Sequence, residues 1–372
     1  MEKLLKQLIE QGISEQVFPG AAAAIACGTG TARRTWLAVA GWQDQRDQSA
    51  VTEATLFDLA SLSKALATAL LCYHFFAEGH LHPDDTLAKL WPGTLPPDKQ
   101  QISLRRLLSH SSGLAAYHPW FKELAPVPCQ DNKGQLLQRI LADPLAYPPQ
   151  SRCLYSDFGY IILGHLLEEL TGNDLATNFR THIAGPLGLA NELVYHLRPE
   201  DRARCAATED CSWRGRMLRG EVHDEHCWLL GGVAGHAGLF GTITGVLRLC
   251  GAILDGWHSP SAGCSWAAFL PNGLQRQLHQ QTWCLGFDTP TAGASSSGRY
   301  FSILSIGHLG YTGTSFWIDR VKEVVVVLLT NRVHPSRDNG KIRPFRPYFH
   351  DAVMEKLLRD ERDKRRAGKS HI

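Results

Sequence analysis

The chain has 372 residues, of which 44% are hydrophobic and 20% charged, a composition that supports a packed core and excludes disorder of the whole chain. Basic and acidic residues nearly balance, 38 against 36, so the net charge indicates neither a nucleic-acid nor a membrane-surface partner. The length corresponds to about two or three domains, or to one large enzyme with an inserted lobe.

The N-terminus predicts an amphipathic helix and not an export signal. Glu2, Lys6 and Glu10 interrupt any apolar stretch, and the leucines between them recur at helical spacing. The longest apolar runs, residues 21–27 and 324–329, are far shorter than the roughly 20 residues of a membrane-spanning helix. We therefore expect a cytoplasmic protein whose ten cysteines are free thiols.

Hydrophobic periodicity and turn residues predict helices and short strands along the rest of the chain. Two strand hairpins are expected, the first at residues 21–27 and 35–40, the second at 315–318 and 324–330. Helices are expected at residues 57–76 after a turn, 104–108, 158–170 and 246–254. The proline-rich residues 80–150 are otherwise expected as loop.

The composition changes along the chain, from a proline-rich stretch at 80–150 to a glycine-rich stretch at 231–241, and this change suggests a discontinuous domain organisation. We expect residues 1–75 and 215–358 to form one α/β body and residues 76–214 a mainly helical lobe. Residues 359–372 are highly charged and are expected as a tail.

Ser61 and Lys64 are the first candidate catalytic pair. They stand three residues apart at the start of a predicted helix, which places them on one face. A serine hydroxyl is a weak nucleophile, and a partly desolvated amine beside it can take its proton. The alternative is that Ser61 caps the helix and Lys64 is solvated, and this short pattern alone does not exclude it.

Two further motifs follow in a meaningful order. Tyr155-Ser-Asp157 precedes the helix predicted at 158–170, and His308-Leu-Gly310 precedes the strand predicted at 315–318. With Ser61-x-x-Lys64, the chain resembles the serine β-lactamase and penicillin-binding-protein family, in particular its class C-like branch of esterases and D-peptidases. The resemblance runs from about residue 18 to residue 335 and includes the segments 56–64, 102–114, 235–240 and 307–315.

The resemblance implies a β-lactamase/transpeptidase-like α+β fold, with an antiparallel sheet flanked by helices and an inserted, mainly helical lobe. The active site would lie between them. Ser61 would be acylated, Lys64 would hold or accept its proton, and Tyr155 would act as a phenolate-like base. Since tyrosine titrates at about pH 10, an adjacent ammonium is expected to lower its pKa.

The resemblance also implies supporting roles. The backbone N–H groups of Ser61 and Tyr311 would form an oxyanion hole beside Gly310, and His308 would orient Tyr155 or the substrate. Each residue has a plainer alternative. Tyr155 can be a core tyrosine, Asp157 a helix cap, His308 an inert histidine and Gly310 a turn glycine.

Two positions depart from the family pattern. Asp157 stands where the family usually has Asn, and an ionised carboxylate beside Lys64 stabilises the ammonium and weakens it as a base. Leu309 stands where Thr is usual, and Leu has no hydroxyl to bind a substrate carboxylate. We therefore expect poor β-lactam turnover and better activity on uncharged or weakly charged esters and amides.

No cofactor or metal is expected. Cys205, Cys211, His223, His226 and Cys227 are residue types that bind zinc, but Cys-x5-Cys is not the usual ligand spacing. By resemblance, residues 221–224 and His236 are expected at the rim of the site. A basic run at 341–346 is expected as a solvated face.

The predicted function is serine acyl hydrolysis of small esters, amides or peptides through an acyl-Ser61 intermediate, with no nucleic-acid or membrane partner. The enzymatic alternative is a β-lactamase or D,D-carboxypeptidase. The alternative from another class is a non-catalytic penicillin-binding-like sensor module. The sequence leaves the substrate and the oligomeric state open, and a monomer is the working expectation.

Overall fold

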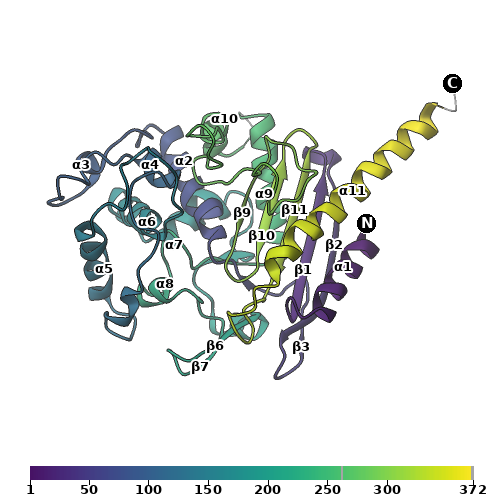
Figure 1. The fold of residues 1–372 in the computed structure, drawn as a ribbon, viewed down its shortest axis with the longest axis horizontal. Coiled ribbons are helices and arrows are strands. Elements are labelled where there is room, and N and C mark those ends of the chain that lie inside the picture. The colour runs from purple at the N-terminus through teal and green to yellow at the C-terminus, as the bar shows by residue number, and fades with distance from the viewer. Residues whose placement is uncertain (261–262, 370–372) are drawn as a thin grey trace.

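A six-stranded antiparallel sheet forms the centre of the computed structural model, which describes residues 1–260 and 263–369 (Figure 1). Its strand order, β3-β2-β1-β11-β10-β9, places strands from the two ends of the chain side by side. The strands of this sheet are β1 (Gly20–Cys27), β2 (Arg34–Asp44), β3 (Ser49–Ala50), β9 (Ile306–Leu309), β10 (Ser315–Asp319) and β11 (Val324–Thr330). The antiparallel α+β architecture expected from the sequence is confirmed.

Both faces of this sheet are buried. Odd-numbered residues of β1 pack with α1 (Glu2–Ser14) and α11 (Ile342–Lys369), which crosses the sheet in Figure 1. Even-numbered residues of β1 pack with α9 (Ile243–His258). Because successive side chains point to opposite faces, a strand covered on both sides needs a continuous apolar run.

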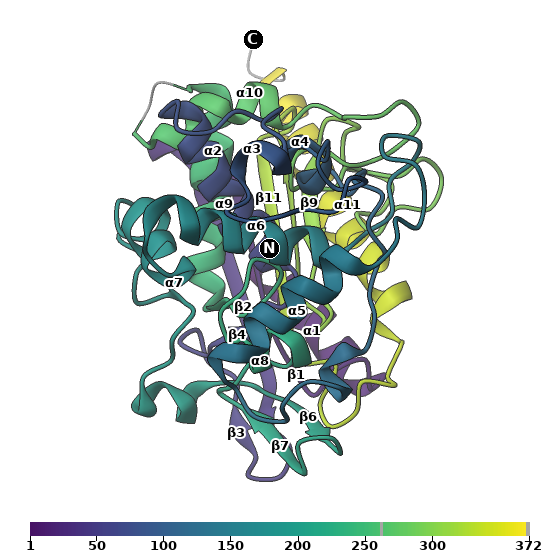
Figure 2. The same ribbon diagram turned by 90° about the vertical axis from the view of Figure 1, so that its left-hand side faces the viewer.

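The remaining helices gather mainly on one side of the sheet, and Figure 2 looks onto them. They are α2 (Leu70–Ala77), α3 (Leu87–Leu90), α4 (Leu104–Leu108), α5 (Gln130–Ala142), α6 (Asp157–Thr171), α7 (Leu175–Phe179), α8 (Glu225–Leu229) and α10 (Leu270–Gly273). Two small sheets join segments around them. One has the order β4 (Phe57–Asp58), β8 (Phe240–Gly241), β5 (Leu193–Val194), and the other pairs β6 (Ala207–Cys211) with β7 (Arg216–Arg219).

The expected hairpins are present, and so are the helices expected at 104–108, 158–170 and 246–254. One expected helix differs, because the segment after Ser61 is π-helical over Lys64–Ala69 before α2 begins. The Thr68 hydroxyl in this segment donates to the Gly235 carbonyl at 2.7 Å. Wide turns of this kind are frequent at functional sites.

The C-terminal segment, residues 359–372, is only partly described by the structure. The backbone of α11 continues to Lys369, so the segment expected as a charged tail starts as an extension of this helix. Residues 370–372 lie outside the described part of the chain. No helix in the described part combines the length and apolar character needed to cross a membrane. The division into body and lobe stays a prediction.

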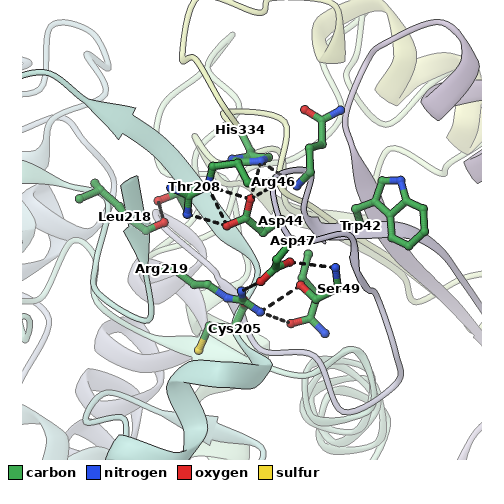
Figure 3. Close-up of polar contacts among 12 residues, drawn as sticks. Trp42, Asp44, Arg46, Asp47, Ser49, Cys205, Thr208, Leu218, Arg219 and His334 are labelled. Atoms are coloured by element: carbon green, nitrogen blue, oxygen red, sulfur yellow. Dashed lines mark hydrogen bonds and ion pairs between the residues drawn. The ribbon is translucent and has the colours of Figure 1, made fainter. Parts of the chain in front are cut away.

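A polar cluster fastens the β2–β3 turn to the β6–β7 hairpin (Figure 3). The Arg219 guanidinium donates to the Asp47 carboxylate at 2.7 Å and to the Cys205 carbonyl at 2.8 Å. Beside it, Asp44 is buried, and its carboxylate lies 3.4 Å from the His334 ring. Residues from three distant parts of the sequence are thereby joined at this end of the molecule.

Candidate active site

A strained turn presents Ser61. It follows β4, and Ala60 adopts a left-handed backbone conformation with φ of 47°, which is uncommon for a residue with a Cβ atom. The buried Asp58 carboxylate accepts the Ala60 N–H at 2.8 Å and the His223 N–H at 2.7 Å. The Ser63 hydroxyl donates to the Ala60 carbonyl at 2.7 Å. These contacts hold the turn and leave the Ser61 side chain half-buried.

Lys64 lies directly beneath the Ser61 hydroxyl. Its fully buried Nζ donates to Ser61 Oγ at 2.9 Å, lies 2.7 Å from the Asp157 carboxylate, and donates to the His236 carbonyl at 3.0 Å. Burial disfavours its charged form, but the Asp157 carboxylate and Tyr155 outweigh burial and raise the pKa of Lys64. Lys64 is therefore an ammonium that donates a hydrogen bond to Ser61.

Tyr155 completes the group around Ser61. The Lys64 Nζ lies 5.0 Å from the centre of its ring, and the Tyr155 hydroxyl has hydrogen-bonding contacts with the Lys64 and Ser61 side chains. Burial raises the pKa of Tyr155, and the lowering effect of Lys64 does not offset it, partly because Asp157 adds to the rise. The ammonium lowers this pKa as expected, but burial has the larger effect, so the net pKa of Tyr155 is raised.

Asp157 is the first residue of α6, and Ser156 occupies the cap position in its place. Its carboxylate pairs with Lys64 instead of capping the helix. Asp157 is therefore the counter-ion of the Lys64 ammonium.

His308 lies within β9, a strand that the sequence analysis did not predict. Its ring is buried, and its centre lies 6.0 Å from that of Tyr155. Burial and the nearby Lys64 lower the pKa of His308 to about 3, so the imidazole is neutral. Because its Nδ1 contacts the Leu309 carbonyl at 2.9 Å, the proton is on Nδ1 and Nε2 is an acceptor.

Gly310 and Tyr311 follow β9 at the wall of the site. A Cβ atom on Gly310 would lie 2.0 Å from Thr314 Oγ1, so this position requires glycine. The Gly310 N–H donates to the Thr314 carbonyl at 2.8 Å. Within residues 1–260 and 263–369, neither the Ser61 nor the Tyr311 N–H has a hydrogen-bond acceptor, so both can bind an oxyanion.

A cavity of about 450 Å³ opens in front of these residues. The sequence-predicted residues that line it are Ser61, Tyr155, His308, Gly310 and Tyr311, with Leu309 beside them. Lys64 and Asp157 lie behind Ser61. Expected at the rim, His236 is instead buried behind Lys64, where its ring contacts the Asp224 carboxylate at 2.8 Å.

The sequence analysis missed one wall of this cavity. Trp283 packs on Tyr155 with ring centres 5.6 Å apart, and no motif marked it. Arg343 and Arg346 line the same cavity, as does Arg332, which the sequence had already suggested at the mouth of the cleft. Two of these belong to the basic run at 341–346, which was expected to be solvated. Arg346 is instead buried, and burial lowers its pKa to about 9.

The residues considered as zinc ligands have other contacts. The His223 ring contacts the Glu209 carboxylate at 3.1 Å, and the His226 ring accepts the Phe121 N–H at 3.2 Å. Among the described residues, no three His, Cys, Asp or Glu side chains are grouped to hold a metal ion.

Comparison with known proteins identifies the family of this chain. The Beta-lactamase family model matches residues 5–346. The "Putative D-alanyl-D-alanine carboxypeptidase" of Escherichia coli (strain K12) is 34% identical over 319 residues, which cover 78% of this chain and 72% of the relative. The protein of the same name from Salmonella gallinarum is 31% identical over 321 residues, 79% of this chain and 73% of the relative.

Solved structures have the same fold. "EstCE1, a hydrolase with promiscuous acyltransferase activity" has a TM-score of 0.73 at 21% identity, with 95% of this chain and 98% of that chain covered. A mutant of simvastatin synthase (LovD) from Aspergillus terreus has a TM-score of 0.70 at 19% identity, with 96% of this chain and 95% of that chain covered. The chain therefore belongs to the β-lactamase family of serine hydrolases.

Proposed function

We propose that this serine hydrolase acts on small esters, amides or peptides through an acyl-Ser61 intermediate. The observation that carries the proposal is the contact of Ser61 Oγ with Lys64 Nζ at 2.9 Å, in a group that also contains Tyr155. A serine at the floor of a cavity, joined to a cation and a phenol, is an arrangement for nucleophilic catalysis.

The charge state of Lys64 assigns the role of base to Tyr155. The minor phenolate form of Tyr155 takes the Ser61 proton while Oγ bonds to the substrate carbonyl carbon, and the Lys64 ammonium stabilises the phenolate. The oxyanion accepts hydrogen bonds from the Ser61 and Tyr311 N–H groups. Its collapse breaks the bond to the leaving group, which takes the proton from Tyr155. Water then attacks the acyl-enzyme by the same steps, releasing the acid and restoring Ser61.

One observation favours the D,D-carboxypeptidase or β-lactamase alternative as a second candidate. The guanidinium of Arg346 donates to the Gly310 and Thr314 carbonyls, and in the described part of the chain it has no carboxylate partner. A buried cation without a counter-ion is costly, so a substrate carboxylate would stabilise it. Arg346 would thus bind the substrate carboxylate, which Leu309 cannot do because it has no hydroxyl group.

Hydrolysis of a p-nitrophenyl short-chain ester tests the primary proposal, comparing the purified protein with Ser61→Ala. We expect activity in the parent protein and none above background in the variant, with equal thermal midpoints. A peptide ending in D-Ala-D-Ala and its C-terminal amide, tested in parallel, separate the second candidate. Stable labelling of Ser61 by a fluorescent penicillin without turnover of any substrate would favour the sensor module instead.

A further inference from the structure

His110 holds an unusual backbone position next to the site. It follows α4 with φ of 55°, the left-handed region that a residue with a Cβ atom seldom adopts, and it is 1% exposed. Its carbonyl accepts the Leu154 N–H at 2.8 Å and the Tyr147 hydroxyl at 2.9 Å. Its ring Nδ1 accepts the Ser156 N–H at 3.1 Å.

These contacts hold the backbone on both sides of Tyr155 in the sequence. Leu154 and Ser156, the residues before and after Tyr155, are both bonded to His110. The imidazole ring also packs on the Tyr155 ring, with centres 4.6 Å apart. Trp283 packs edge-on against the same imidazole at 4.4 Å. The His110 side chain thus contacts both the Tyr155 ring and the backbone of the next residue, Ser156.

The protonation state of His110 follows from its partner. Because Nδ1 accepts a backbone N–H, the ring proton is on Nε2 and the imidazole is neutral. Burial and the nearby Lys64 hold the pKa of His110 well below its ordinary value. His110 therefore does not carry a proton in the reaction, and any contribution it makes is geometric.

We propose that His110 is a positioning residue that sets the Tyr155 hydroxyl against Ser61 and Lys64, by using Nδ1 to hold the backbone at Ser156. The inference rests on the proposed function, in which Tyr155 is the base. A displacement of about 1 Å in a reacting group can cost about a hundredfold in rate. The role therefore predicts an effect on kcat and a requirement for an acceptor at the Nδ1 position.

Two amide variants distinguish this role from simple core packing. In His110→Asn the amide oxygen replaces Nδ1, and asparagine tolerates the left-handed backbone. In His110→Gln the amide oxygen lies nearer the position of Nε2. On the p-nitrophenyl ester we expect His110→Asn to retain kcat within about fivefold and His110→Gln to lose about 10- to 100-fold, with KM within about twofold.

Thermal midpoints are measured for both variants, and His110→Ala replaces the Gln variant if that variant does not fold. Equal kcat losses in the Asn variant and the variant without the acceptor, or a loss confined to KM, would overturn the inference. Tyr155→Phe is measured alongside. Its full activity would refute the base role of Tyr155 itself, whereas an inactive Tyr155→Phe with equal His110 variants refutes only the role of His110.

Discussion

At the scale of single residues, the sequence predicts which side chains lie around Ser61 but not the direction of their pKa shifts or the whole cavity wall. The motifs marked Ser61, Lys64 and Tyr155 as candidates, since each occupies a short pattern of fixed spacing, and the structure places these three side chains together. The direction in which the pKa of Tyr155 moves is decided mainly by how deeply its ring is buried, and a linear sequence does not show this depth. The cavity wall was missed for a related reason, because Trp283 carries no motif.

The pH dependence follows from the raised pKa of Tyr155. In the proposed mechanism the base is the phenolate, whose fraction grows as pH rises towards that pKa, while Lys64 stays an ammonium. We expect kcat/KM for a neutral ester to rise about tenfold per pH unit between about pH 6.5 and 8.5. Rates of Ser61→Ala at each pH supply the background. A plateau below about pH 8 would contradict this assignment of the base.

Asp157→Asn tests the carboxylate that departs from the family pattern. Its charge raises the pKa of both Lys64 and Tyr155, so removing it lowers both. The fraction of phenolate at pH 7 then increases. We expect the pH profile of kcat/KM to shift towards lower pH, with activity at pH 7 retained or raised by about tenfold at most.

The control for this variant is Asp338→Asn, whose exposed carboxylate lines the outer part of the same cavity. We expect no shift of its profile for the neutral ester. Complete loss of esterase activity in Asp157→Asn would show that the carboxylate is required and not merely tolerated.

Arg343→Ala tests whether the arginine wall recognises a carboxylate. Arg343 is exposed on α11 at the cavity, so its removal should not disturb the core. We expect KM for a peptide with a free C-terminal carboxylate to rise about fivefold, while kcat/KM for the neutral ester stays the same. Equal effects on the peptide and on its C-terminal amide would rule out charge recognition.

At the scale of elements, the accuracy of prediction followed the length of each apolar pattern. The strands β1 and β11 were identified because they are continuous apolar runs, and α6 because Gly172 ends it in a left-handed conformation. The short strand β9 contains Gly307 and His308 and has no alternating pattern. The helix α5 lies in a proline-rich stretch that suggested loop, although it contains no proline itself.

Arg219→Ala tests the cluster that fastens β2 and β3 to β7. The side chain is 19% exposed and donates to backbone and side-chain acceptors on three segments. Its loss leaves part-buried carbonyls without a donor, so we expect the free energy of unfolding to fall by about 1–3 kcal/mol in urea titration.

Arg34→Ala is the matched control on β2, because the exposed Arg34 guanidinium stacks on Trp36. We expect a change within about 0.5 kcal/mol there. Equal losses of stability in the two variants would show that the cluster does not stabilise this end of the molecule. We expect esterase activity to be unchanged in both variants.

At the scale of the whole molecule, the cavity is assembled from segments spread over most of the chain. Ser61, Tyr155, Trp283 and the residues after 306 meet only because the sheet and the helices are packed together. The family resemblance predicted that the three motifs would meet. It did not predict that Arg343 and Arg346 line the cavity, since their position depends on where α11 crosses the sheet.

The pairing of β1 with β11 sets a condition on biosynthesis. The register joins Ala21 to Thr330 and Cys27 to Val324, so the middle of the sheet is incomplete until β11 has been synthesised, long after β1. Until then β1 is an edge strand that is apolar on both faces, a template for aggregation. Contacts of such long sequence separation also form slowly. Before β11 is made, α1 can cover one face of β1 and β2 can pair with one of its edges, but the edge that β11 later occupies stays open.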